Sequence, residues 1–253
     1  MKIIDAVWEK RNLGVDVKEL ICDGTETAEE LGKQLAKIQV PYSVLKIPSG
    51  STDLLLAAQS AGYHFMESSI SLDGKVSTMA LPRIYQRFEP YIQVNRAEGE
   101  LLDKILQEIE TGTIFETDRI TRDPYFSQKI AGKRYANWTK DELNKGAEAV
   151  ISYYKEQPVA FGINMCSDGT VYDAFLGGVF SEAANKGLGF LALYANMESI
   201  RSQGGTKIIT HVSSNNMPIL RLHMQYGYEI TDMNYVLVRH NFVDCLCSEQ
   251  HKL

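Results

Sequence analysis

A lysine and two glycines stand where a predicted strand passes through a short loop into a predicted helix. The run A-F-L-G-G-V-F-S-E-A-A-N-K-G-L-G places Lys186, Gly187 and Gly189 at its end. The first N–H groups of a helix have no partner within the helix, and the helix dipole favours an anion there. Glycine lets the backbone approach a ligand closely, and the ammonium of Lys186 adds positive charge. The junction therefore predicts a pyrophosphate site, although the pattern alone also fits a plain tight turn.

The two best-known nucleotide motifs do not explain this loop. The chain contains neither GxGxxG nor GxxxxGK[ST]. The strand before the loop belongs to a predicted antiparallel meander and does not open a βαβ unit. A dinucleotide-binding or P-loop function is therefore disfavoured.

The loop resembles the acyl-CoA motif of the GNAT superfamily, in which a strand ending V-x-hydrophobic-P leads into R/Q-x-x-G-x-G/A at a helix start. The matching residues are Val179, Ser181, Gly187 and Gly189. The resemblance implies that Val179 and Ser181 bond the pantetheine arm. It also implies that the pyrophosphate of acetyl-CoA, or of another acyl-CoA, is held by Asn185, Lys186, Gly187, Leu188, Gly189 and Phe190. The chain departs from the motif at Ala184, where the family has Arg or Gln.

A second family block, N-x-x-A-x-x-L-Y-x-x-x-G-F, resembles residues 216–228. The residues in common are Asn216, Leu222, Gly227 and Tyr228. His223 stands where the family has the tyrosine that protonates the departing CoA thiolate. Because histidine can donate a proton near neutral pH, the resemblance implies a catalytic role for His223 and a cofactor contact for Asn216. The alternative is that His223 only packs beside the cofactor, with Tyr226 as a fallback donor on another face of the helix.

Residues 119–143 resemble the acceptor side of amino-sugar N-acetyltransferases of the dTDP-fucosamine acetyltransferase type. The acceptor implied is a nucleotide-linked amino sugar, and the expected substrate contacts include Arg119, Arg122 and Tyr172. Lys133 and Arg134 add to the charge that could pair with a diphosphate. Ion pairing with Asp118, Asp123 and Asp141 is an equal alternative.

The implied mechanism is direct attack of a small-molecule amine on the thioester, with backbone N–H groups polarising the carbonyl. It requires no metal and no covalent enzyme intermediate. Tyr172 or Asp173 could accept the amine proton, but alternation along a strand sends these two side chains to opposite faces. Another amine acceptor, such as an amino acid, polyamine or protein N-terminus, and a non-catalytic acyl-CoA-binding module remain as alternatives.

Hydrophobic periodicity predicts an α/β (α+β) fold, and the resemblance makes it a GNAT fold with a mixed, mainly antiparallel sheet flanked by helices. We expect a partial GNAT-like domain at 1–88 and an acyltransferase domain at 89–253. Strands are predicted over 17–22, 42–47, 63–72, 91–97, 147–154, 158–165, 171–180, 207–212 and 228–238. Helices are predicted over 27–38, 51–61, 100–110, 188–203 and 216–226, and from 127 to 146.

An internal repeat links the two predicted domains. A shift of 165 positions aligns Leu55 with Leu220, Gly62 with Gly227, Tyr63 with Tyr228 and Leu72 with Leu237. Both segments have the pattern helix, Gly-Tyr, strand. The N-terminal domain is therefore expected to be a partial copy of the end of the C-terminal domain.

Composition narrows the class of protein. The 253 residues carry a formal net charge of −6, which disfavours a nucleic-acid-binding surface. No apolar run reaches the roughly 18 residues of a membrane span, and the sequence MKIIDAVWEKRN at the start becomes charged before any signal-like apolar run develops. The four cysteines, Cys22, Cys166, Cys245 and Cys247, are expected to be reduced thiols. We expect a cytoplasmic protein with no membrane partner, in which a homodimer is allowed but not required.

Overall fold

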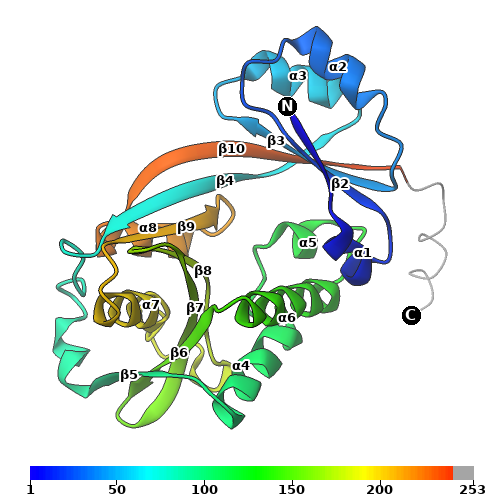
Figure 1. The fold of residues 1–253 in the computed structure, drawn as a ribbon. Helices are drawn as coiled ribbons and strands as arrows, with labels where there is room; N and C mark the ends of the chain where they lie inside the picture. Colours follow the sequence, from blue (N-terminus) through cyan, green and yellow to red (C-terminus); the bar gives the residue numbers. More distant parts are fainter. Residues whose placement is uncertain (242–253) are drawn as a thin grey trace.

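A computed structural model describes residues 1–241, and its strands form one ten-stranded sheet (Figure 1). The strands lie in the order β1-β2-β3-β10-β4-β9-β8-β7-β6-β5. Their bounds are β1 Lys2–Asp5, β2 Val17–Ile21, β3 Tyr42–Pro48, β4 His64–Lys75, β5 Ile92–Arg96, β6 Glu148–Tyr154, β7 Gln157–Asp168, β8 Val171–Val179, β9 Lys207–Ser213 and β10 Glu229–His240. Among these strands only β2 with β3 and β8 with β9 pair in parallel, which confirms the mixed, mainly antiparallel sheet.

Helices flank this sheet in separate groups (Figure 1). Their bounds are α1 Val7–Leu13, α2 Ala28–Leu35, α3 Thr52–Ser60, α4 Glu100–Thr111, α5 Arg119–Arg122, α6 Gln128–Asn144, α7 Leu191–Ser202 and α8 Met217–Tyr226, with 3₁₀ turns η1 Gln86–Tyr91 and η2 Ser181–Ala183. Helices α2 and α3 pack on each other, whereas α1, α4 and α5 pack on α6. No helix within residues 1–241 has the length and apolar character needed to cross a bilayer.

The repeat expected from the sequence is confirmed by the element boundaries. Strand β9, helix α8 and strand β10 each begin 165 residues after β3, α3 and β4, respectively. Each helix ends at a glycine in the left-handed region, Gly62 at φ +82° and Gly227 at φ +90°. Glycine adopts this conformation without a Cβ penalty, so the local sequence itself favours the change of chain direction after each helix. Tyr63 and Tyr228, which follow, are both buried.

The two copies exchange their last strands. Strand β10 pairs with β3 of the first copy, and β4 pairs with β9 of the second copy, while β4 and β10 also pair with each other. Figure 1 shows β4 and β10 running side by side between the two ends of the molecule. The sheet is therefore continuous across the boundary expected at residues 88 and 89, and that boundary remains a prediction.

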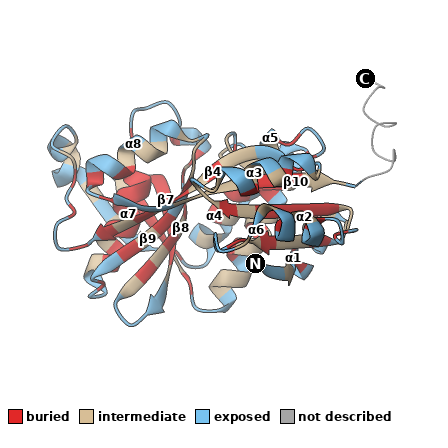
Figure 2. Cartoon of the chain, turned by 90° about the horizontal axis from the view of Figure 1, so that it is seen from above, coloured by how far each residue is buried: buried red, intermediate tan, exposed pale blue. Residues whose placement is uncertain are grey.

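Helix α7 is buried along nearly its whole length (Figure 2). It packs against β6, β7 and β8 on one side. The segment between β4 and β5 covers its start, where the Tyr85 ring stacks on Phe190 with centroids 4.1 Å apart and Phe88 lies 5.5 Å away. A helix that is buried on nearly all sides needs such cover. The residues that precede α7 are thereby held in a fixed position.

The N-terminal elements β1 and α1 were not predicted. Helix α1 exposes Val7 and Trp8, so its sequence has no buried apolar stripe, and its buried residue is Glu9. Of the four cysteines, Cys22 is buried and Cys166 is exposed, both as free thiols. Cys245 and Cys247 lie outside the described residues.

Candidate active site

Strands β8 and β9 separate in the middle of the sheet. They pair in parallel from Val171–Lys207 to Asp173–Ile209, and no further pair follows. At the point of separation the hydroxyl of Thr210 donates to the Ala174 carbonyl at 2.8 Å. On its other side β8 carries a β-bulge, because Ala174 and Phe175 together lie opposite Asn164 of β7. The end of β8, as far as Val179, thus has one edge without a strand partner.

A cavity of about 370 Å³ occupies this opening. Its walls come from β4, β8, β9, α7, α8 and the segment from residue 114 to α6. Its main polar lining residues are Glu67, Asp118, Asp173, Asn196, His211, Ser213, Asn216 and His223. Two residues predicted from the sequence, Asn216 and His223, therefore lie together in it. Val179, Ser181 and the loop 185–190 do not line this cavity.

The loop before α7 presents free backbone donors. Among residues 1–241, no group accepts a hydrogen bond from any N–H of residues 185–190. Gly187 has φ +71°, and a Cβ at Gly187 or Gly189 would meet nothing within 4 Å. Leu188 and Phe190 are buried and anchor the loop, and the Phe190 carbonyl accepts the Tyr226 hydroxyl at 2.9 Å. Helix α7 begins at Leu191, three residues later than predicted.

Ser181 is already engaged within the chain. Its N–H donates to the Glu108 carboxylate at 2.9 Å, and its hydroxyl donates to the other carboxylate oxygen at 3.2 Å. Glu108 comes from α4 and is 9% exposed. A pantetheine contact of Ser181 would have to displace or share this carboxylate. No sequence signal pointed to Glu108, because α4 is distant from the loop in the chain.

His223 is buried in the neutral form. Its Nδ1 lies 2.8 Å from the Ile219 carbonyl, which can only accept, so Nδ1 carries the proton and donates. Burial lowers the pKa of His223 to about 4. At neutral pH, Nε2 is therefore an acceptor, which does not favour the general-acid role expected from the sequence. The fallback donor Tyr226 is turned away, as expected, with its hydroxyl bound to Phe190.

Asn216 is the N-cap residue of α8. Its side-chain oxygen accepts the N–H of Ile219 at 3.3 Å and caps the helix. The cap fixes the first turn of α8 against the cavity. A cofactor contact through the side-chain amide of Asn216 remains compatible with this cap, because the oxygen alone is engaged.

Besides Asp118, two carboxylates line the cavity. Burial raises the pKa of Asp173, and its Oδ1 is buried without a hydrogen-bond partner among the described residues. Burial also raises the pKa of Glu67, which accepts a hydrogen bond from the Ser213 hydroxyl.

Tyr172 lies on the other face of β8 from Asp173, as the alternation of side chains along a strand predicted. Its hydroxyl donates to Gln203 at 3.3 Å. Tyr172, expected as a substrate contact, is thus placed in the core beside α7.

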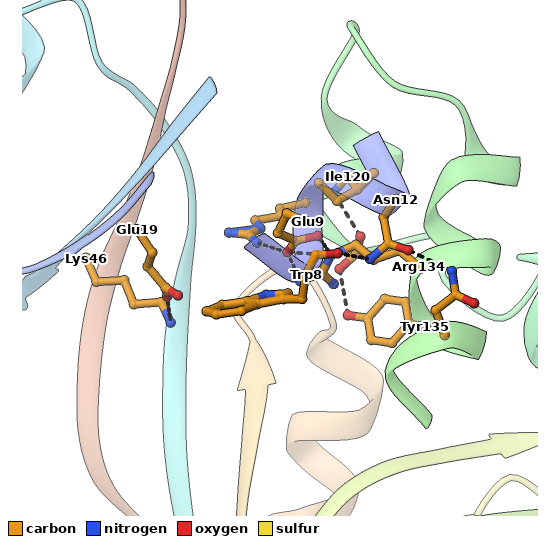
Figure 3. A network of polar contacts seen from close by, with 11 residues as sticks. Trp8, Glu9, Asn12, Glu19, Lys46, Ile120, Arg134 and Tyr135 are labelled. Carbon is orange, nitrogen blue, oxygen red and sulfur yellow. Dashed lines mark hydrogen bonds and ion pairs between the residues drawn. The ribbon is translucent and has the colours of Figure 1, made fainter. Parts of the chain in front are cut away.

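A second cavity, of about 530 Å³, adjoins the first. The two share five lining residues, namely Glu67, Ser69, Asp118, Tyr135 and Trp138. The second cavity lies between α1, the β2–β3 pair and α6. Figure 3 shows its network, with Trp8 between the Glu19–Lys46 pair and the contacts of Glu9. The second cavity therefore lies directly beside the cavity at the β8–β9 opening.

The basic residues expected at the acceptor side are mostly engaged. Arg134 donates three hydrogen bonds to the Glu9 carboxylate, between 2.6 and 2.9 Å (Figure 3). Arg122 donates to the Glu116 carbonyl at 2.9 Å and lines neither cavity. Arg119 lines the second cavity, 3.9 Å from the Glu9 carboxylate. The partner of Arg119 and Arg134 is thus Glu9 of the unpredicted helix α1.

The equivalent site of the N-terminal copy is closed. Strands β2 and β3 stay paired up to Ile21–Lys46, and the N–H of Cys22 continues the pairing at 2.9 Å. In the following loop, the N–H groups of Asp23 and Gly24 donate to the Glu26 carboxylate. An internal carboxylate thus takes the donors that the second copy leaves free. Only the second copy combines a strand opening with free loop N–H groups within residues 1–241.

Comparison with known proteins gives no match by sequence, either to a family model or to a curated protein. Solved structures do match. A functionally unknown conserved protein from Staphylococcus epidermidis ATCC 12228 has a TM-score of 0.57 at 12% identity, over 90% of this chain and 84% of that one. A GCN5-related N-acetyltransferase from Kribbella flavida has a TM-score of 0.55 at 16% identity, over 88% and 81%. A tandem GNAT protein from the clavulanic acid biosynthesis pathway has a TM-score of 0.50 at 11% identity, over 81% and 65%.

These likenesses extend over both copies of the repeat, because each covers more than four fifths of the chain. At 11 to 16% identity, these likenesses show the fold alone. The chain has the GNAT fold that its sequence motifs led us to expect.

Proposed function

We propose that this chain transfers an acyl group, with acetyl as the family default, from acyl-CoA to a primary amine. The observation that carries the proposal is the opening between β8 and β9 beside a loop with free N–H donors. An extended pantetheine arm can bond the free edge of β8 near Val179. The pyrophosphate then meets the N–H groups of residues 185–190 and the exposed Lys186. Ser181 joins this site if its N–H donates to the ligand instead of to the Glu108 carboxylate.

The amine reaches the thioester through the second cavity. Asp173 lies at the last paired position before the opening, next to the bulge at Ala174 and Phe175. Its raised pKa suits a base that takes a proton from an ammonium group. The free amine attacks the thioester carbon, and its second proton passes to sulfur as the C–S bond breaks. Amide and CoA thiol result, so the balance requires no separate acid and no protonated His223.

The expected acceptor, a nucleotide-linked amino sugar, is not the one that this geometry favours. A diphosphate needs several free cations, and Arg134 is bound to Glu9 while Arg122 lies outside both cavities. We therefore propose a primary amine without a nucleotide diphosphate.

Replacing the base tests the proposal. Asp173→Asn keeps the shape of the side chain, so kcat should fall on the order of 100-fold or more while CoA affinity is unchanged. The matched control is Asp168→Asn, an exposed residue at the end of β7. The assay follows release of the CoA thiol from acetyl-CoA with a panel of primary amines. Equal kcat in both variants removes Asp173 from the mechanism.

A non-catalytic acyl-CoA-binding module is the second candidate, because the family tyrosine is replaced by a neutral, buried His223. The same assay separates the two functions. CoA binding without turnover of any amine in the panel would select the module.

A further inference from the structure

Arg119 is a cation with unused hydrogen-bond donors. Its side chain is 14% exposed and lines the second cavity, and it donates no hydrogen bond to any of residues 1–241. A guanidinium group has five N–H donors. Because Arg119 lines the second cavity and bonds no described residue, its donors are available to a ligand there.

Glu9 does not supply that partner. Both of its carboxylate oxygens accept hydrogen bonds from Arg134, at 2.6 to 2.9 Å. Arg119 is left with an ion pair at 3.9 Å, which exceeds hydrogen-bond length. Two guanidinium groups thus share one carboxylate, and one positive charge remains without a direct partner.

The other cations that line the second cavity each have an acidic partner. Lys46 pairs with Glu19, Arg11 pairs with Asp141, and Lys145 pairs with Glu142. Within the described lining, Arg119 is therefore the cation that is free to bind an anion in this cavity.

Among the acids that line the second cavity, the two without an ion pair lie where the two cavities meet. Asp118 accepts hydrogen bonds from the Tyr135 hydroxyl and the Ile120 N–H. Glu67 accepts one from Ser213. Burial raises the pKa of Glu67, and the positive charge of Arg119 acts against that rise. The two side chains therefore interact electrostatically. A ligand that spans the junction meets two carboxylates at one end and a guanidinium at the other.

We propose that the second cavity binds an amine that also carries an anionic oxygen group, a carboxylate or a phosphate. Arg119 binds the anionic group, and the ammonium lies beside Glu67 and Asp118 before it is acylated. Trp8 and Trp138, the two tryptophans of the chain, line the same cavity and enclose the carbon skeleton. Because it specifies the acceptor, this assignment rests on the proposed acyl transfer.

Matched acceptors test it. β-Alanine and O-phosphoethanolamine carry an anionic group, whereas β-alanine amide and ethanolamine carry none. With acetyl-CoA saturating, kcat/KM for the anionic member of each pair should exceed that of the neutral member on the order of 10- to 100-fold. Arg119→Gln should abolish the preference and leave the neutral amines unchanged. Arg119→Lys should retain part of it, because lysine keeps the charge and loses the planar fork.

Arg122→Gln is the matched control, since Arg122 belongs to the same short helix and lines neither cavity. It should keep the wild-type preference. Equal turnover of anionic and neutral amines by the wild-type protein overturns this inference and leaves acyl transfer intact. A uniform loss on all four amines in Arg119→Gln, with a lowered melting temperature, would assign Arg119 a structural role instead. If no amine in the wider panel is acylated, the proposed function fails as well.

Discussion

Gly187→Glu places a carboxylate where the pyrophosphate of acyl-CoA is proposed to lie. Gly187 is exposed at φ +71°, and a side chain there would point into open space. The substitution therefore adds charge and bulk to the loop without a clash inside the protein. The substitution should lower the free energy of unfolding by about 1 kcal/mol, because a residue other than glycine is strained in the left-handed conformation.

The effect on binding follows from Coulomb's law. Two unit charges about 5 Å apart repel by about 3 kcal/mol at an effective dielectric constant near 20 and by about 1 kcal/mol in bulk water. The loop is exposed, so the repulsion lies within this range. CoA affinity should therefore fall about 5- to 150-fold. The loss should shrink as salt rises, because an exposed charge is screened.

Gly204→Glu is the control for the backbone cost. Gly204 lies just beyond the other end of α7, is exposed, has φ +79° and also faces open space. Titration calorimetry with CoA at low and high salt compares the wild type with both variants. Equal CoA affinity in Gly187→Glu and Gly204→Glu would refute the assignment of the loop 185–190 as the pyrophosphate site.

Two further predictions follow from the buried histidine and from the closed first copy. The pKa of His223 is about 4 in the folded protein against an ordinary value of 6.5, so the unfolded chain binds the extra proton between these values. Its contribution to stability is complete above pH 6.5 and is lost as pH falls toward 4, by about 2 kcal/mol between pH 7 and pH 5. Denaturant unfolding should show a smaller loss in His223→Asn, which can keep the donor to Ile219; an identical loss would contradict the neutral assignment. Calorimetry should also give one CoA per chain, and two equal sites would contradict the closure by Glu26.

The elements of each copy could be predicted from sequence because their signals are local. The helix, Gly-Tyr, strand pattern depends on apolar spacing and on a left-handed glycine, both of which can be read within about 20 residues. The strand exchange could not be predicted this way. Whether β4 pairs beside β9 or remains within its own copy depends on contacts between residues more than 130 positions apart.

The polar residues of the candidate site also differ in whether their signal is local. The free N–H groups of the loop 185–190 could be predicted, because glycines before a helix leave backbone donors accessible. Glu108, Glu9 and Glu67 were missed, because a lone acid on a short or distant element has no pattern of its own. Their importance arises from their neighbours, which are Ser181, Arg134 and Ser213.

The exchange of strands gives the first copy a part in the site of the second copy. Strand β4 belongs to the first copy in sequence, yet it pairs with β9 and carries Glu67 to the junction of the two cavities. Strands β2 and β3 supply Glu19 and Lys46 to the outer cavity. The first copy, whose own strands β2 and β3 stay paired, thus forms one wall of the proposed acceptor site of the second. Acceptor choice should therefore respond to changes in the first copy that leave CoA affinity unchanged, because β2, β3 and β4 line the second cavity and contribute no residue to the loop 185–190.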